Sequence, residues 1–248
     1  MPPRRVSRRD AVKAEMKFDL HYFETVDSTN RLAASGRPGD VFVAANQTAG
    51  RGRLDHKWHS RAGENLLMSA VLDVAGIAPS EVATFPLVAG LATVKAVDHL
   101  APSAFTACRL KWPNDVYVGS RKICGILCER RGDDIIVGIG LNVRQREFPE
   151  ELREKATSLI REGIDVTVEA VMEKVLASLS DFYAIWHRGG FAAVYPDFAS
   201  IDFLKGREVT VMQTDDDASP VRGICGGVTA DGSLLVGNTR IYAGEVRW

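Results

Sequence analysis

Two short segments of this chain combine the residue types that bind and activate an anion. The first, 50–58, reads GRGRLDHKW, so two glycines alternate with two arginines ahead of a lysine and a tryptophan. Glycine permits left-handed backbone and close approach to a ligand, and arginine offers a planar fork of donors for phosphate or carboxylate. The pattern favours a loop that folds over an anion, although such loops are also common as solvated turns.

The second segment, 111–115, reads KWPND and places Lys111 at the end of an apolar run. A partly desolvated lysine acts strongly on an anion. Two unit charges ~4 Å apart interact by about 1 kcal/mol in water and about 4 kcal/mol at an effective dielectric near 20. The alternative is a surface lysine, because lysine is rarely buried without a partner. Asn114 and Asp115 either form a simple turn or orient Lys111 or a metal ion, and both interpretations remain open.

The elements that must position these segments follow from hydrophobic periodicity. Strands are predicted at 18–23, 41–45, 66–72, 108–111, 116–118, 122–129 and 135–141. The strand at 41–45 leads into the first segment, and the strand at 108–111 ends at Lys111. The strands from 116 to 141 are joined by short turns, which indicates antiparallel neighbours.

Three helices are predicted from capping residues and apolar spacing. One begins at Asp27 or Ser28 and stops at Gly36. Another runs over 79–100, where Pro86 marks a kink or a later start. A third begins after Thr167 and ends near His187, before two glycines.

The sequence predicts an α+β fold with a mixed sheet backed by helices. From about residue 205 the pattern changes to short strands with Asp-Gly and Gly-Gly turns, which indicates a small antiparallel barrel. We therefore expect a basic, disordered tail at 1–17, a catalytic domain at 18–200 and a C-terminal domain at 201–248.

Composition excludes several protein classes. The 248 residues carry a net charge of −1, which gives no field that attracts nucleic acid or an anionic membrane. No apolar run approaches the ~20 residues that span a bilayer, and no secretory apolar segment follows the basic tail. The four cysteines form no C-x-x-C pair, so we expect buried thiols in a reducing cytoplasm. His56 and His59 lack the further ligands of a zinc site.

Further segments recur around these two in a fixed order. They read DSTN at 27–30, QTA at 47–49, GENLLMS at 63–69, KICGILCE at 122–129 and VGIGLNV at 137–143. Together with GRGR…KW and KWPND they resemble the biotin protein ligases, from about Phe23 to about Val143. The resemblance implies the class II synthetase-like biotin/lipoate ligase fold with an SH3-like C-terminal domain.

The resemblance also implies a reaction. ATP and Mg²⁺ would activate biotin to biotinyl-5'-AMP, and biotin would pass to a lysine of a carboxylase's biotin carboxyl carrier domain. The chemistry fits the residues, because cations must cancel the repulsion between biotin carboxylate and ATP. No P-loop is present, so ATP must be held in another way. The alternative is a lipoate or octanoate ligase or transferase of the same fold.

About 20 residues precede the first recurring segment, too few for a DNA-binding domain, so we expect the form without one and no repressor activity. The oligomeric state stays open, with a homodimer as one option. The carrier's identity, the lifetime of the bound adenylate and the metal ligands stay open as well.

Site residues follow from the motifs. The predicted catalytic residues are Lys111 and Arg53. The predicted biotin-binding residues are Ser28, Thr29, Asn30, Gln47, Gly50, Arg51, Gly52, Lys111 and Gly125. The predicted ATP-binding residues are Arg53, Lys57, Trp58, Asn114 and Asn142.

Two of these positions, Ser28 and Gly125, have competing interpretations, and so does Asp55 in the loop. Ser28 is a helix cap, a contact for the biotin ureido ring, or both. Gly125 lies in a strand, where it marks a bulge or lets a ligand lie against the backbone. The loop departs from the family at Asp55 and His56, where Gly or Asn followed by Arg is usual. There Asp55 either weakens pyrophosphate binding or pairs with a loop cation.

Overall fold

The computed structural model describes residues 16–101, 107–213 and 219–248, and Asp55 by its backbone alone. The predicted basic tail therefore lies almost entirely outside the described residues. Its expected disorder stays a prediction.

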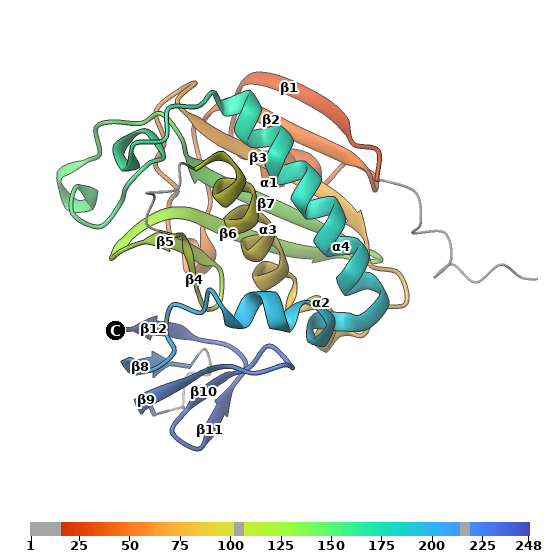
Figure 1. Ribbon diagram of the computed structural model, residues 1–248. Coiled ribbons are helices and arrows are strands. Elements are labelled where there is room, and N and C mark those ends of the chain that lie inside the picture. Colours follow the sequence, from red (N-terminus) through yellow and green to blue (C-terminus); the bar gives the residue numbers. More distant parts are fainter. Residues whose placement is uncertain (1–15, 102–106, 214–218) are drawn as a thin grey trace, which may run out of the picture.

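A seven-stranded mixed sheet forms the centre of the larger part of the molecule (Figure 1). Its strands are β1 (Asp19–Val26), β2 (Asp40–Gln47), β3 (Asn65–Asp73), β4 (Arg109–Lys111), β5 (Asp115–Val118), β6 (Arg121–Arg131) and β7 (Asp134–Asn142). Their spatial order is β1-β2-β3-β7-β6-β5-β4. Only β1 and β2 are parallel; every other neighbouring pair is antiparallel. All seven predicted strands are present, most of them slightly longer than expected.

Helices cover both faces of this sheet, because successive side chains of a strand point to opposite sides. α3 (Phe85–Leu100) and α4 (Val168–Ala199) pack together on one face, in front of the sheet in Figure 1. Val41 and Val43 belong to the core on that side, whereas Phe42 belongs to a smaller cluster on the other. The short α1 (Thr29–Ala33) contributes Ala33 to that second cluster. The α1 face is thinly covered, which leaves room for a cavity.

The helix predicted at 79–100 is two helices, α2 (Pro79–Val82) and α3. Pro86 lies in the first turn of α3, where its missing N–H costs no hydrogen bond, so the later start is correct. Among the described residues, 79–100 is also the one segment apolar and long enough to cross a membrane. In the fold 72% of its most apolar window is buried, so its apolar character belongs to a core helix.

The third helix breaks close to the predicted end near His187, at Gly190, but the sequence did not predict the helical segment that follows the break. Thr167 caps α4 as expected, accepting the N–H of Ala170, but the helix resumes after Gly190 and reaches Ala199. Gly190 breaks the helix with φ 68°. The Glu81 carboxylate from α2 accepts the Phe191 N–H at 2.9 Å, which satisfies a donor that the break would leave free.

A second, five-stranded antiparallel sheet follows α4, as the sequence predicts. Its strands are β8 (Glu208–Met212), β9 (Val221–Val228), β10 (Leu234–Val236), β11 (Thr239–Ile241) and β12 (Glu245–Arg247), in the order β11-β10-β9-β8-β12. It lies at the lower end of the molecule in Figure 1, near β4. The Trp112 indole N–H donates to Gly232 O at 3.1 Å, and Leu110 exchanges backbone hydrogen bonds with Ile201 and Phe203. The KWPND segment therefore lies where the two sheets meet.

Candidate active site

A cavity of about 170 Å³ opens on the α1 face of the large sheet. Its walls come from α1, the loop that follows β2, the β4–β5 turn, and β12 of the C-terminal sheet. The predicted site residues that line it are Ser28, Thr29, Asn30, Gln47, Arg51, Gly52, Arg53, Lys57, Trp58, Lys111, Asn114 and Gly125. Among them, Ser28 and Gly125 are 97 positions apart in the sequence and line the same cavity.

Three glycines, Gly125, Gly138 and Gly140, form the floor of the cavity. Their lack of a side chain lets side chains of α1 and the loop lie directly on their backbone. A Cβ on Gly138 would lie 2.0 Å from Asn30 Oδ1. A Cβ on Gly140 would lie 2.6 Å from the Trp58 ring, and one on Gly125 would lie 2.9 Å from the same ring. Gly125 and Gly140 pair across β6 and β7, so they share one face. The Trp58 ring lies against the Gly125 backbone, and the predicted contact of a ligand there stays a prediction.

A buried polar group lies where α1 meets the end of β2. The Thr29 N–H donates to Gln47 Oε1 at 2.7 Å, and its hydroxyl lies 3.2 Å from the same oxygen. Ser28 is the residue before α1 and is 2% exposed, yet its hydroxyl does not cap the helix. Of the two interpretations of Ser28, the ligand contact is the one that the hydroxyl remains free to make.

Asn30 is held by the protein itself. Its Nδ2 donates to Leu127 O at 3.2 Å and to Glu129 Oε2 at 2.7 Å, and Ser69 Oγ lies 2.7 Å from Asn30 Oδ1. Both amide hydrogens are occupied, so Asn30 can offer a ligand only its carbonyl oxygen. Ser69 and Glu129 are part of this arrangement although the sequence did not single them out.

The loop predicted to fold over an anion is a short turn with few anchors. Arg51 and Lys57 form an isolated bridge, and the Gly52 N–H donates to His56 O at 2.7 Å. Leu54 takes the left-handed conformation, φ 51°, and its side chain is 55% exposed. The predicted pairing of Asp55 with a loop cation lies outside the described side chains.

The two arginines of the loop contact different parts of the site. Arg51 Nη1 lies 3.1 Å from Glu129 Oε1, beside the α1 polar group. Arg53 Nη1 donates to Asn114 Oδ1 at 3.3 Å and lies 3.5 Å from Gly244 O of the C-terminal domain. Burial lowers the pKa of Arg53, while Asp115 and Glu245 oppose that shift. Arg51 therefore serves the α1 side, and Arg53 serves the side formed by the C-terminal domain.

Three lysines line the cavity, and the sequence motifs singled out two of them, Lys57 and Lys111, but not Lys122. Burial lowers the pKa of Lys111, which faces the positive charges of Lys122 and Arg53 as well as the carboxylates of Asp115 and Glu245. Lys122 Nζ lies 2.7 Å from Asp115 Oδ1 and 5.7 Å from the centre of the Trp58 ring. Lys122 stands three residues before Gly125 in the same strand, and its Nζ lies 3.3 Å from the position that a Cβ on Gly125 would take.

Asn114 and Asp115 do more than form a turn. Asn114 Nδ2 donates to Ile126 O at 2.7 Å, which fixes its oxygen toward Arg53. Asp115 pairs with Lys122 and stands opposite Lys111 in the β4–β5 register. These contacts hold Arg53 and Lys122, whereas the predicted orientation of Lys111 or of a metal ion stays a prediction.

Gly50 and Asn142 do not line the cavity. A Cβ on Gly50 would lie 2.9 Å from Trp58 O, so the glycine allows the loop to close on itself. Asn142 is 3% exposed, and its Nδ2 donates to Thr157 O at 2.9 Å. Their predicted contacts with biotin and ATP stay predictions.

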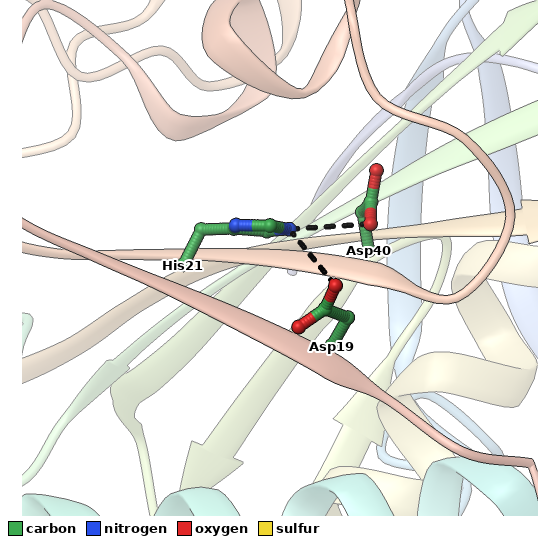
Figure 2. A group of neighbouring side chains, drawn as sticks. All are labelled: Asp19, His21 and Asp40. Carbon is green, nitrogen blue, oxygen red and sulfur yellow. Dashed lines mark hydrogen bonds and ion pairs between the residues drawn. The ribbon is translucent and has the colours of Figure 1, made fainter.

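Asp19, His21 and Asp40 form a cluster of potential metal ligands at the other end of β1 and β2 (Figure 2). His21 Nε2 lies 3.2 Å from Asp40 Oδ1 and 3.9 Å from Asp19 Oδ2. Asp40 also accepts the Arg37 N–H at 2.9 Å, and the His21 ring stacks on Phe42. These contacts explain the cluster without a metal ion, because they hold the edge strand β1 against β2. The cluster also offers only three ligands, whereas structural zinc sites usually have four.

Two other features carry no acyl-transfer chemistry. A hollow of about 320 Å³ between β1 and the start of α4 is larger than the cavity, but it is lined by apolar groups, Glu24, Asn65 and Glu169. No cation lines it, so it does not suit a nucleotide. The four cysteines are free, and burial raises the pKa of Cys108 and Cys124, which keeps these thiols protonated.

Comparison with known proteins agrees with this geometry. The family model described as "Biotin/lipoate A/B protein ligase family" matches residues 22–145. The bifunctional ligase/repressor BirA of Bacillus subtilis is 32% identical over 200 residues, 75% of this chain and 60% of that protein. The biotin–[acetyl-CoA-carboxylase] ligase of Mycobacterium tuberculosis is 40% identical over 136 residues, 53% of this chain and 50% of that protein. This chain thus spans about 60% of the Bacillus relative's length.

Among solved structures, the biotin protein ligase of Aquifex aeolicus in complex with biotin and ATP superposes with a TM-score of 0.81. It is 31% identical, and the match covers 92% of this chain and 98% of that one. The similarity includes both sheets, because so much of each chain is matched. The chain therefore belongs to the biotin/lipoate A/B protein ligase family and, within it, to the biotin protein ligases.

Proposed function

We propose that the protein activates biotin with ATP and transfers it to a lysine of a biotin carboxyl carrier domain. In the first step a biotin carboxylate oxygen attacks the α-phosphorus of ATP, and pyrophosphate leaves. In the second step the neutral amine of the carrier lysine attacks the acyl carbon of biotinyl-5'-AMP, and AMP leaves. The observation that carries the proposal is the convergence of Lys111, Lys122 and Arg53 on one cavity beside the buried polar group of α1.

These cations suit the first step because both reactants are anions. A positive charge in a partly buried cavity acts more strongly than in water, and a preorganised charge stabilises the α-phosphate in the transition state. Lys111 and Lys122 approach from β4 and β6, and Arg53 approaches from the loop. Their fixed partners, Asn114 and Asp115, keep the mutually repelling cations directed at the cavity.

The polar group of α1 suits the ureido ring of biotin. The ring has N–H donors and a carbonyl acceptor, so it requires a few polar groups in an otherwise apolar pocket. Ser28, Thr29 and Gln47 supply them, and Met68 and Ile139 line the cavity nearby. Lipoate and octanoate carry no ureido ring and would leave the buried Ser28 hydroxyl without a ligand partner, which disfavours them.

ATP is expected to enter as its magnesium complex. Mg²⁺ prefers oxygen ligands and is commonly held by one or two carboxylates together with substrate phosphates. Asp115 and Glu245 are the carboxylates that line the cavity, so the donor set fits such an ion. The free thiols are compatible with a cytoplasmic location, and a homodimer remains an option.

The decisive experiment offers the protein ATP with biotin, lipoate or octanoate, and identifies the acyl-AMP by mass spectrometry. We expect biotinyl-AMP alone. Formation of lipoyl-AMP or octanoyl-AMP in preference would replace the proposal by the alternative. A second arm adds a biotin carboxyl carrier domain, with its target lysine intact or changed to arginine. Only the intact domain should gain the mass of biotin.

A further inference from the structure

Glu129 lies near the end of β6 and does not line the cavity, yet both of its oxygens contact residues that do. Oε2 accepts from Asn30 Nδ2 at 2.7 Å, and Oε1 lies 3.1 Å from Arg51 Nη1. The Glu129 side chain is 33% exposed and that of Arg51 is 45% exposed. One carboxylate thus joins the buried floor of the cavity to its exposed loop.

Glu129 matters more for the position of Arg51 than for the position of Asn30. Asn30 is 5% exposed and is also held by Leu127 O and Ser69, so its position does not depend on Glu129 alone. Arg51 is exposed, and Glu129 is its one ion-pair partner among the described residues. Loss of the carboxylate charge should therefore disturb the loop far more than the floor.

We propose that Glu129 is a positioning residue that keeps Arg51 on the biotin side of the cavity before any ligand binds. The Glu129 bridge, meaning Glu129 with Asn30 and Arg51, engages the guanidinium at Nη1. The remaining N–H donors of Arg51 stay directed at the cavity, because a guanidinium has five donors in a fixed fork. This role rests on the proposed function, since it assigns Arg51 to the acyl side and leaves Arg53 for the phosphate.

Charge gives a reason for an acidic residue at this place. The positive charges of Arg51, Arg53 and Lys57 repel one another. An ion pair at one end of the loop therefore lowers the electrostatic free energy of holding them close together. Arg51 is paired with a charged carboxylate, whereas Arg53 contacts the neutral Asn114 side chain and Gly244 O. Arg53 therefore remains able to turn to an incoming phosphate, whereas Arg51 is held.

The test compares Glu129→Gln with the wild type by amide hydrogen exchange of 50–58 in the ligand-free protein. Glutamine keeps an oxygen for Asn30 but loses the charge that holds Arg51. We expect exchange in the loop to rise about three- to tenfold, as suits a partly exposed charged pair, while α1 and β6 stay protected. Unchanged loop exchange would overturn the proposal.

Arg51→Gln provides the second variant and decides the matter if Glu129→Gln fails to fold. It should raise loop exchange by the same factor, and the double variant should add nothing further. If the increases in exchange of the two single variants add in the double variant, the two residues act separately, and the proposed coupling between Glu129 and Arg51 is wrong. Glu147→Gln is the matched control, because it breaks a similar pair with Arg61, 2.8 Å apart and outside the cavity.

Kinetics supply a readout that a merely structural role would not move. Glu129→Gln should raise the KM for biotin about tenfold while kcat and the KM for ATP stay within about twofold. A proportional fall in kcat for both substrates would indicate a general loss of structure and would contradict the proposal. Failure of the wild type to form biotinyl-AMP would refute the proposed function alone, since the exchange measurement needs no ligand.

Discussion

The α1 side chains on the floor of the cavity are buried and already hydrogen-bonded, whereas the loop is largely exposed. On the floor, Thr29 and Asn30 are at most 5% exposed, and their hydrogen bonds to neighbouring strands are already formed. In the loop, Arg51 and Lys57 are exposed, and Leu54 points into solvent. Under the proposed function, the same site must recognise a small neutral ring and also enclose a reactive anhydride. The ring needs preorganised partners, whereas the anhydride needs a cover that opens to admit ATP.

The largest effect is expected at Lys111, because it supplies charge where the floor and the loop meet. Lys111→Ala should reduce adenylate formation by about 10²–10³-fold or more, with the fold intact. The measurement is pyrophosphate release together with a thermal unfolding curve. Unchanged release would remove Lys111 from the catalytic residues and leave that role to Lys122.

Arg53→Gly tests the loop side of the comparison. A charged hydrogen bond contributes about 1.5–3 kcal/mol, so the variant should release biotinyl-AMP about tenfold faster while biotin affinity changes little. Dissociation of preformed adenylate gives the rate directly. Escape of the adenylate should also biotinylate unrelated proteins added to the mixture. Equal rates in variant and wild type would mean that the roles of the two arginines are misassigned.

A pair of glycine variants separates the rigid floor from the movable loop. Gly138→Ala places a methyl against the fixed Asn30 and should cost about 1–3 kcal/mol of stability, with weaker biotin binding. Gly140→Ala meets Trp58, which belongs to the loop and can move away, so its cost should be less than about 1 kcal/mol. Chemical denaturation and biotin titration measure both. Equal costs would show that Trp58 is as fixed as Asn30.

Ligand should order the loop and leave the floor unchanged. Fixing a residue costs about 1–2 kcal/mol, so several contacts from Arg51 to His59 must form together when biotin and ATP bind. Hydrogen exchange with and without both ligands measures this, and protection should increase only in the loop. Strong protection of the loop in the empty protein would show that it is preformed.

The smallest effect concerns alkaline pH. Burial lowers the pKa of Lys111 from its usual value of 10.5, so the ammonium loses its proton earlier than a free lysine as pH rises. Adenylate formation should therefore decline through that lowered pKa. Lys111→Arg should shift the decline to higher pH, because the guanidinium stays charged. An identical alkaline limb in this variant would assign the titration to another group.

The sequence by itself determined the strands, the capping of α4 by Thr167, the second sheet, and twelve of the 26 residues that line the cavity. These features depend on local periodicity, turn residues and motifs, which are readable along the chain. The helical segment that follows the break at Gly190 was not predicted, because the Glu81 carboxylate that accepts the Phe191 N–H comes from 110 residues away.

Only the tertiary structure decided which side chains meet. Lys122 becomes a cavity residue because β6 places it over Gly125, and Gly138 must be glycine because Asn30 crosses it from α1. Glu129 joins Asn30 to Arg51 across the ends of separate elements. No periodicity encodes such pairs, since they depend on strand order and on the packing of a short helix against the sheet. Cations can be recognised in the sequence, but the partners that hold them in place cannot.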